Sequence, residues 1–324
     1  MKKISDYSAE AEMTLRSLNL SEKEPSSLYG PVDYALSSGG KRLRPGLVMM
    51  TAESFGGEAA LEASKNPAAG IEMFHNFTLL HDDVMDHSEM RRGRESVWKK
   101  WDAPTAILSG DTMLTLATQL VSEVADDKLR KVLDTFNHMA MEVYEGQRLD
   151  IDFEKIEVVN SDIYIEMIRK KTGALLGAAG AIGAIIAGAT DKDVAAMATF
   201  GEMLGIAFQI QDDWLDTFGD SSTFGKPIGG DILNDKKTFL LVKAMEAEQG
   251  TVEALKVTMK ELKGEAKIKA VTRLYDKLNL NEETRKAVSF YIKQALKALK
   301  STTLSEEKKE PYRLLVEKLT GRKK

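Results

Sequence analysis

The chain of 324 residues contains no cysteine, and it has few of the patterns that mark β-structure. The absence of cysteine excludes disulfide bonds, zinc–thiolate sites and cysteine nucleophiles. There are only 7 prolines, and alternating β-branched runs joined by hairpin turns are nearly absent. Helical periodicity instead runs almost from end to end, and no boundary rich in Pro, Gly and Ser divides the chain. We therefore expect an all-α protein with a single domain over residues 1–324.

Charge and hydropathy argue against two kinds of partner. The net charge of −5 gives no global reason to expect binding to nucleic acid or to an anionic membrane surface. The N-terminus, MKKISDYS, lacks the apolar core of a signal peptide. The wholly apolar stretch at 173–189 is at the short limit for a membrane span. We interpret it as a buried helix, and we expect a cytoplasmic protein without a membrane span.

One acidic pattern, DDxxD, occurs twice. Residues 82–86 read DDVMD and residues 212–216 read DDWLD, each after an apolar approach. On a helix, three carboxylates within about 6 Å of helix rise repel one another unless a cation lies between them. Mg²⁺ prefers such hard oxygen ligands, and it typically bridges a few carboxylates to substrate phosphates. One copy would be compatible with a solvated helix face. Two facing copies predict a metal-bound polyphosphate.

Basic residues gather close to these acidic motifs. They occur in GGKRLRP at 39–45, RRGR at 91–94 and RKKT at 169–172, and again at Lys226 and in KKT at 236–238. Arginine binds phosphate through bidentate hydrogen bonds, and lysine binds it as a point charge. A basic run alone is usually a solvated surface. Together with Mg²⁺, these cations are sufficient to neutralise two diphosphates.

The order of these motifs resembles that of the all-trans polyprenyl diphosphate synthases, the group that includes farnesyl and geranylgeranyl diphosphate synthases. The resemblance spans roughly residues 30–240. It rests on GGKRLRP at 39–45, His75, LLHDDVMD at 79–86, Arg91-Arg92, EGQRLD at 145–150, KTG at 171–173, FQIQDDWLD at 208–216 and GKPIGGDILNDKKT at 225–238. It implies the isoprenoid synthase type of fold, a single large helical bundle around a central cavity, and a homodimer.

The resemblance also implies a role for each matching position. The ligands of Mg²⁺ on an allylic diphosphate would be Asp82, Asp83, Asp86, Asp212, Asp213 and Asp216. That diphosphate would also contact Arg91, Lys171, Gln209, Lys226 and Lys236. The diphosphate of isopentenyl diphosphate would contact Lys41, Arg44, His75 and Arg92. The catalytic residues would be Asp82, Asp86, Lys171 and Asp212. The last family motif is Lys-x-Thr, which puts Lys236 on the functional lysine and Lys237 on the variable position. Thr172 and Gln209 either orient substrate groups or hydrogen-bond between helices.

The implied reaction is a Mg²⁺-dependent prenyl transfer that joins the two substrates head to tail. Diphosphate leaves the allylic substrate while Mg²⁺ and the cations stabilise the charge that develops on its oxygens. An allylic carbocation remains in an apolar pocket from which water is excluded. The double bond of isopentenyl diphosphate attacks this carbocation. A proton is then lost, and the departing diphosphate is the expected acceptor because no protein base is evident.

Product length depends on the residues that precede the first acidic motif. In the family, an aromatic residue five positions before the first aspartate acts as the floor of the pocket. Phe77 has this position, Thr78 beside it is small, and Phe74 lies one turn further along the helix. The combination is most like short-chain synthases that make a C20 product, geranylgeranyl diphosphate, with C15 farnesyl diphosphate next. The alternative is that both phenylalanines are ordinary core residues.

Three other functions fit part of the pattern. Glu72 and His75 form a Glu-x-x-His motif, but a di-iron bundle needs two such motifs and the other three histidines lack the glutamate. A class I terpene cyclase shares the fold and an aspartate-rich motif, but it does not need a second diphosphate site at 39–45. A non-catalytic partner subunit of a heteromeric synthase is the remaining alternative. Activity of the purified chain alone would distinguish an enzyme from such a subunit.

Overall fold

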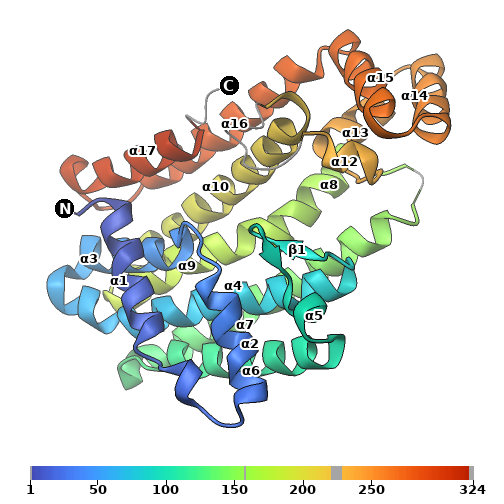
Figure 1. Ribbon diagram of the computed structural model, residues 1–324. Helices are drawn as coiled ribbons and strands as arrows, with labels where there is room; N and C mark the ends of the chain where they lie inside the picture. Colours follow the sequence, from blue (N-terminus) through green and yellow to red (C-terminus); the bar gives the residue numbers. More distant parts are fainter. Residues whose placement is uncertain (1, 157, 220–227, 321–324) are drawn as a thin grey trace. The chain divides into compact units, whose positions relative to one another are not determined.

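The computed structural model describes residues 2–156, 158–219 and 228–320, and most of these residues are helical (Figure 1). The all-α fold class predicted from the sequence is confirmed. The chain divides into two compact units. Unit 1 comprises Met1–His138, Ala178–Ala198 and Thr302–Pro311, and unit 2 comprises Met139–Gly177, Thr199–Ser301 and Tyr312–Lys324. Neither unit is one continuous segment, and the expectation of a single domain stays a prediction.

Unit 1 consists of the N-terminal helices and one short hairpin (Figure 1). Its elements are α1 (Ile4–Arg16), the 3-10 helix η1 (Leu20–Glu22), α2 (Ser26–Ser37), α3 (Leu43–Ala63), α4 (Lys65–Met85), β1 (Met90–Arg91), β2 (Arg94–Glu95), α5 (Val97–Lys100) and α6 (Ala103–Val121). Four further helices are each divided between the two units. These helices are α7 (Asp126–Phe153), α9 (Ala174–Ile186), α10 (Asp191–Phe218) and α17 (Glu306–Thr320).

Capping side chains define where several helices begin. Asp102 accepts a hydrogen bond from the N–H of Thr105 at 2.7 Å, and Pro104 lies in the first turn of α6. Thr190 caps α10 in the same way, because its hydroxyl accepts a hydrogen bond from the N–H of Asp193 at 3.2 Å. Asp and Thr are residue types that favour the N-cap position, so the local sequence accounts for where both helices begin.

The hairpin formed by β1 and β2 was not predicted from the sequence. The two strands are antiparallel and have two residues each. Arg92 and Gly93 form the turn between them with φ values of 53° and 77°. Positive φ at both turn residues matches the twist of the flanking strands. The strands are too short to show alternating hydrophobicity, which explains why the pattern was missed.

The core of unit 1 is built around α4, which packs against α3 and α6. Phe74 of α4 is fully buried, and its ring meets that of Phe136 edge-on with the centroids 5.4 Å apart. Phe77 contacts the other side of Phe74, also edge-on, at 5.4 Å. Each such pair stabilises the fold by about 0.5–1.5 kcal/mol beyond the burial of its area. The first acidic motif is therefore at the end of a firmly packed helix.

Unit 2 contains the remaining helices. Its own elements are α8 (Ser161–Ile168), the π-helical turn η2 (Arg169–Gly173), α12 (Gly230–Leu233), α13 (Phe239–Met245), α14 (Gln249–Glu261), α15 (Gly264–Lys277) and α16 (Leu280–Lys300). One apolar cluster of this unit joins α8, α10 and α13 through residues that include Tyr164, Ile210 and Phe239. The second acidic motif, at the end of α10, adjoins this cluster.

Two apolar helices require attention as candidate membrane spans. Most of the stretch at 173–189 forms α9 (Ala174–Ile186), and every residue from 173 to 185 is buried, as expected. Among the described residues, one helix, Asp191–Phe218, is long and apolar enough to cross a membrane. The buried share of its apolar window is 56%, and the helix also carries five aspartates. We therefore interpret it as a core helix.

Candidate active site

The first acidic motif occupies the C-terminal turn of α4. Asp83 is buried, Asp82 is partly buried and Asp86 is exposed at the helix end. Arg91 donates a hydrogen bond through Nε to Oδ1 of Asp83 at 3.0 Å, and its Nη2 lies 3.6 Å from Oδ2 of Asp82. Burial raises the pKa of Asp83, although Arg91 acts in the opposite direction. Arg91 thus binds the motif directly in this structure.

The hairpin directs two neighbouring arginines to different partners. Arg91 bonds to the acidic motif, whereas Arg92 donates a hydrogen bond through Nη1 to the carbonyl of Gly39. Gly40 has a φ of 141°, and a Cβ there would lie 3.1 Å from Nη1 of Arg92. Only glycine fits this position without strain. The turn at 39–40 and the hairpin are therefore joined by a hydrogen bond from the side chain of Arg92 to the backbone of Gly39.

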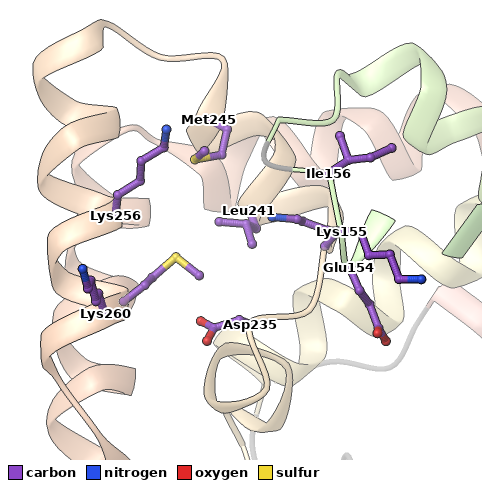
Figure 2. Close-up of a pocket in the computed structure, with 10 residues that line it drawn as sticks. Glu154, Lys155, Ile156, Asp235, Leu241, Met245, Lys256 and Lys260 are labelled. Atoms are coloured by element: carbon purple, nitrogen blue, oxygen red, sulfur yellow. The ribbon is translucent and has the colours of Figure 1, made fainter. Parts of the chain in front are cut away.

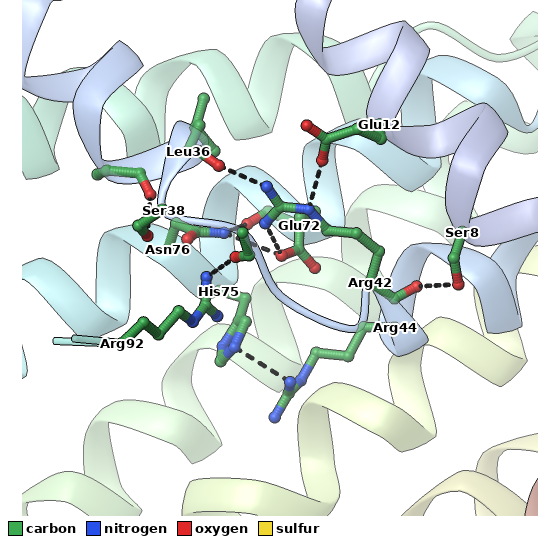
Figure 3. A network of polar contacts seen from close by, with 12 residues as sticks. Ser8, Glu12, Leu36, Ser38, Arg42, Arg44, Glu72, His75, Asn76 and Arg92 are labelled. Carbon is green, nitrogen blue, oxygen red and sulfur yellow. Dashed lines mark hydrogen bonds and ion pairs between the residues drawn. The ribbon is translucent and has the colours of Figure 1, made fainter. Parts of the chain in front are cut away.

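The basic loop that follows brings two of the predicted residues together. Nη1 of Arg44 lies 3.1 Å from Nε2 of His75, whereas Lys41 is exposed (Figure 3). Burial holds the pKa of His75 well below its usual value, and the positive charges of Arg44 and Arg92 lower it further. His75 is consequently neutral near pH 7. A neutral imidazole and two guanidinium groups form a site suited to an anion.

In the second acidic motif, Asp213 is engaged by the surrounding protein. It accepts hydrogen bonds from the hydroxyl of Tyr164, from Nε2 of Gln209 at 3.1 Å and from the N–H of Phe239 at 2.8 Å. Burial raises the pKa of Asp213 to about 7, and the charge of Asp231 adds to this shift. The three donors act in the opposite direction. Asp213 therefore ties α8, α10 and α13 together.

Asp216 and Asp231 form the second part of this acidic cluster. Asp216 accepts a hydrogen bond from the N–H of Asp231 at 3.0 Å, and burial followed by the charge of Asp231 raises its pKa to about 6. Asp212 lies one turn before Asp216 on α10 and is partly buried. This concentration of negative charge fits a divalent cation with oxygen ligands. Sequence reasoning gave Asp231 no role, although it belongs to a quoted motif.

The described acidic side chains do not by themselves form a complete metal site. Within the three ranges that the structure describes, no group of three or more His, Cys, Asp or Glu side chains is placed to hold a metal ion. Mg²⁺ usually keeps several waters and is held by one or two carboxylates together with substrate phosphates. The acidic motifs suit that kind of site rather than an all-protein cage.

Lys171 and Thr172 lie in the π-helical turn η2. Nζ of Lys171 is 2.5 Å from Oδ2 of Asp150 on α7, so the motif EGQRLD meets the motif KTG. Gly146 of α7 makes this approach possible, because a Cβ there would lie 2.3 Å from the backbone nitrogen of Lys171. Thr172 donates a hydrogen bond to Oε1 of Gln209 at 3.2 Å. This helix-to-helix bond is one of the two roles proposed for that pair, and substrate orientation stays a prediction.

The two lysines of the last motif have different surroundings. The positive charge of Lys236 lowers the pKa of Asp216, whereas Lys237 lines a separate cavity. This difference agrees with Lys236 as the functional lysine and Lys237 as the variable one. Lys226, the other lysine predicted to contact the allylic diphosphate, lies outside the described residues.

The cavity beside Lys237 has a volume of about 440 Å³ and lies within unit 2 (Figure 2). Leu241 and Met245 of α13 form part of its apolar wall, and α14 contributes the opposite side. The side chains of Glu154 and Lys155 on its rim point away from the interior in Figure 2. None of its lining residues belongs to either acidic motif. The cavity is therefore not part of the candidate site.

The residues predicted to set product length belong to a packed aromatic row. Phe77 is 6% exposed, and its ring lies between that of Phe74 and that of His81, with centroid distances of 5.4 and 4.8 Å. Thr78 is partly buried and donates a hydrogen bond to the carbonyl of His75 at 2.8 Å. Phe74 and Phe77 are thus core aromatics, and a floor role for Phe77 is compatible with this packing.

Comparisons with known proteins agree with the motifs. Residues 25–278 match the family model described as polyprenyl synthetase. A short chain isoprenyl diphosphate synthase of Methanothermobacter thermautotrophicus is 39% identical over 74% of this chain and 73% of its own length. A geranylgeranyl diphosphate synthase of Methanosarcina mazei is 39% identical over 68% of both chains. A geranylfarnesyl diphosphate synthase of Aeropyrum pernix is 33% identical over 93% of this chain and 96% of its own.

A solved structure matches the chain along its whole length. The crystal structure of a geranylgeranyl pyrophosphate synthase superimposes with a TM-score of 0.93 and 39% sequence identity, and it covers 100% of both chains. Identity at this level over the full length extends beyond a shared fold. Together with the match over residues 25–278, it shows that the chain belongs to the polyprenyl synthetase family and is a prenyltransferase.

Proposed function

We propose that the protein condenses isopentenyl diphosphate with an allylic diphosphate, head to tail and with Mg²⁺, to give a C20 product. The observation that carries this proposal is the pair of chemically distinct sites. One is a cationic site at Arg44 and His75, where the two side chains lie 3.1 Å apart. The other kind of site is acidic, because each DDxxD motif places carboxylates at the C-terminal end of its own helix, α4 or α10. A cyclase, which has one diphosphate to bind, does not need the first site.

The cationic site is proposed to bind the diphosphate of isopentenyl diphosphate through Lys41, Arg44, His75 and Arg92. Arginine and lysine neutralise a diphosphate in complementary ways, by bidentate hydrogen bonds and as a point charge. His75 is neutral, so it contributes as a hydrogen-bond donor and leaves the charge balance to the other three residues. This arrangement holds the nucleophilic double bond in place without adding a base beside it.

The carboxylate motifs are proposed to hold Mg²⁺ on the allylic diphosphate. Asp83 and Asp213 make hydrogen bonds that position neighbouring elements, which supports Asp82, Asp86 and Asp212 as the principal ligands. Burial and, after it, the charge of Asp231 raise the pKa values of Asp213 and Asp216, and a bound cation would favour the charged form of both carboxylates. When bound, Mg²⁺ supplies charge stabilisation for the departing diphosphate.

Other cations are proposed to complete the allylic site. Arg91, Lys171 and Lys236 would bind the diphosphate oxygens, with Lys226 and Gln209 as further contacts. In this structure Arg91 and Lys171 are paired with Asp83 and Asp150. Binding of a diphosphate would therefore exchange a carboxylate partner for phosphate oxygens. The proton released in the last step would go to the departing diphosphate.

Product length is proposed to be set by Phe77. It is buried five residues before Asp82, which is about 7.5 Å along α4 at 1.5 Å per residue. A ring at that depth would stop a growing chain at C20, and C15 is the next alternative. The relative and the solved structure named geranylgeranyl synthases support C20, whereas a relative named a geranylfarnesyl synthase makes a C25 product the competing outcome.

We further propose that the protein is a cytoplasmic homodimer whose helices surround a central cavity. The family membership supports the dimer. The lack of cysteine fits a reducing compartment. Sedimentation of the purified protein at several concentrations tests the oligomeric state.

The direct test of the proposed function is turnover by the purified chain alone. The protein is incubated with Mg²⁺, isopentenyl diphosphate and, in separate reactions, a C5, C10 or C15 allylic diphosphate, and diphosphate release is followed. We expect release that depends on both substrates and stops when EDTA is added. Release from an allylic diphosphate alone would favour a cyclase. No release with any starter would favour a non-catalytic partner subunit.

A further inference from the structure

Arg42 is the buried member of an otherwise accessible basic loop. Lys41 before it is exposed, whereas the side chain of Arg42 is 3% exposed. Its backbone is left-handed, with φ 46° and ψ 41°, a conformation that few residues other than glycine adopt. Because the backbone turns at this position, the side chain of Arg42 is buried while that of Lys41 is exposed. The family resemblance assigned no role to this residue.

Each nitrogen of the Arg42 guanidinium donates to a different element of unit 1 (Figure 3). Nε donates to Glu12 of α1 at 2.8 Å, Nη1 to Glu72 of α4 at 2.6 Å and Nη2 to the carbonyl of Leu36 at the end of α2 at 2.5 Å. Asn76 of α4 donates to the same Glu72 oxygen at 3.0 Å. The planar fork of arginine matches these three acceptors, and a lysine ammonium does not.

The backbone of Arg42 is fixed as well as its side chain. Ser8 of α1 donates a hydrogen bond through its hydroxyl to the carbonyl of Arg42 at 3.0 Å, and the N–H of Gly46 donates to the same carbonyl at 3.1 Å. A charged group is buried at high cost unless it is paired and hydrogen-bonded, and Arg42 meets both conditions. Arg42 therefore holds the loop through both its side chain and its backbone.

Arg42 and Arg44 bind neighbouring positions of α4. Glu72 and His75 are three residues apart, so they lie close together on one side of the helix. Arg42 bonds to Glu72, and Arg44, two residues along the loop, meets His75 at 3.1 Å. If the first contact were lost, the loop would be free to shift and the second pair would separate.

We infer that Arg42 is a positioning residue for the isopentenyl diphosphate site. It holds the loop at 39–45 against α1 and α4, so that Lys41 and Arg44 present their charges in register with His75. The inference rests on the proposed function for those three residues. Arg42 itself touches no substrate, and its effect is transmitted through the backbone of the loop. A misplacement of about 1 Å is enough to reduce a rate or affinity about 100-fold.

The first test is Arg42→Lys, which keeps the charge and removes the fork. We expect the KM for isopentenyl diphosphate to rise about 10- to 100-fold. The KM for the allylic substrate and kcat should change less than about threefold, because the acidic motifs are not touched. The matched control is Arg16→Gln. Arg16 is the exposed second partner of Glu12, so its loss leaves the bonds of Arg42 in place. The control should change neither KM.

A second variant separates positioning from stability. In the double variant Arg42→Met, Glu72→Met, both buried charges are removed together, and stability should return close to that of the wild type. The KM for isopentenyl diphosphate should nevertheless stay raised, because the loop has lost the side-chain bonds of Arg42 to α1, α2 and α4. A KM that recovers together with stability would overturn the inference, and so would an equal rise in both KM values for Arg42→Lys.

Calorimetric binding of isopentenyl diphosphate makes the test independent of turnover. Wild-type protein that binds this ligand but releases no diphosphate with any starter would overturn the proposed function. The weaker binding expected for Arg42→Lys would still support the positioning role. Equal binding by the wild type and Arg42→Lys, or no binding by the wild type, would overturn the inference.

Discussion

Nη1 of Arg44 lies 3.1 Å from Nε2 of His75, and only one protonation state of the imidazole satisfies this contact. Arginine has donors and no acceptor, so Nε2 must carry the lone pair and Nδ1 the proton. Burial and the surrounding arginines hold the pKa of His75 well below its usual value, which agrees with the neutral ring. His75 thus offers one N–H to an anion.

The first prediction concerns the pH dependence of stability. The pKa of His75 in the folded protein is lower than the unfolded value near 6.5. The unfolded chain therefore binds more protons below that pH, and the free energy of unfolding falls as the pH drops, by at most about 1.4 kcal/mol per pH unit. Asp213 and Asp216, whose pKa values are raised to about 7 and about 6, act in the opposite direction in this pH range and are common to both proteins compared. Urea unfolding at pH 7.5 and pH 5.5 therefore measures the effect of His75 as the difference between the wild type and His75→Gln. His75→Gln, which lacks the titrating ring, should lose less. Parallel losses in the two proteins would contradict the account.

The second prediction contrasts neighbouring aspartates. Asp82→Asn should lower kcat about 10²- to 10³-fold by weakening stabilisation of the departing diphosphate, with little change in stability. Asp83→Asn should instead destabilise the fold by about 1.5–3 kcal/mol, because a charge-assisted hydrogen bond from Arg91 is lost. Steady-state kinetics and urea unfolding measure the two effects, with Glu89→Gln on the exposed hairpin as control. Equal loss of stability in both variants would count against the distinction.

The third prediction concerns the contact between α7 and the π-helical turn. In Gly146→Ala, the new methyl group would lie 2.3 Å from the backbone nitrogen of Lys171. Overpacking should cost about 1–3 kcal/mol and displace Lys171, so the KM for the allylic substrate should rise. Gly250→Ala in α14 is the matched control, because nothing lies within 4 Å of its Cβ. If Gly146→Ala matches the control in stability and in the KM for the allylic substrate, the close contact neither stabilises the fold nor positions Lys171.

The fourth prediction concerns product length. Phe77→Ala should shift the products to C25 or longer, because it removes the proposed floor. Phe74→Ala removes a ring about 4.5 Å further along α4, so it should change the products only in combination with Phe77→Ala. Both substitutions leave buried space and should cost about 3–5 kcal/mol, so product analysis is made below the unfolding temperature. An unchanged C20 product from folded Phe77→Ala would leave Phe77 as a core residue only.

Helical periodicity and the lack of strand patterns were sufficient to predict the all-α fold, and the order of the motifs was sufficient to predict the family. The sequence was less informative about which side chains of a loop are buried and which partners they contact. Arg42 and Arg44 are both arginines of one loop, yet one is buried against Glu72 and the other meets His75. The left-handed backbone at Arg42 decides this, and no local residue preference indicates it.

Two further features depended on packing that the sequence does not reveal. The role of Tyr164 as a donor to Asp213 joins residues 49 positions apart, so no motif contains the pair. The close approach of the π-helical turn at Arg169–Gly173 to α7 depends on the absence of a side chain at Gly146, which is on another helix. Both are long-range contacts between elements far apart in the sequence.

The measurement that tests the central claim most directly is the carbon number of the final product. Purified protein is incubated with Mg²⁺, excess isopentenyl diphosphate and a C15 allylic diphosphate, and the dephosphorylated products are resolved by chromatography. The account predicts one condensation and a C20 product, with the C15 starter left unused when EDTA is present. A C25 or longer product would contradict Phe77 as the floor, and the absence of any elongated product would contradict the prenyl transfer itself.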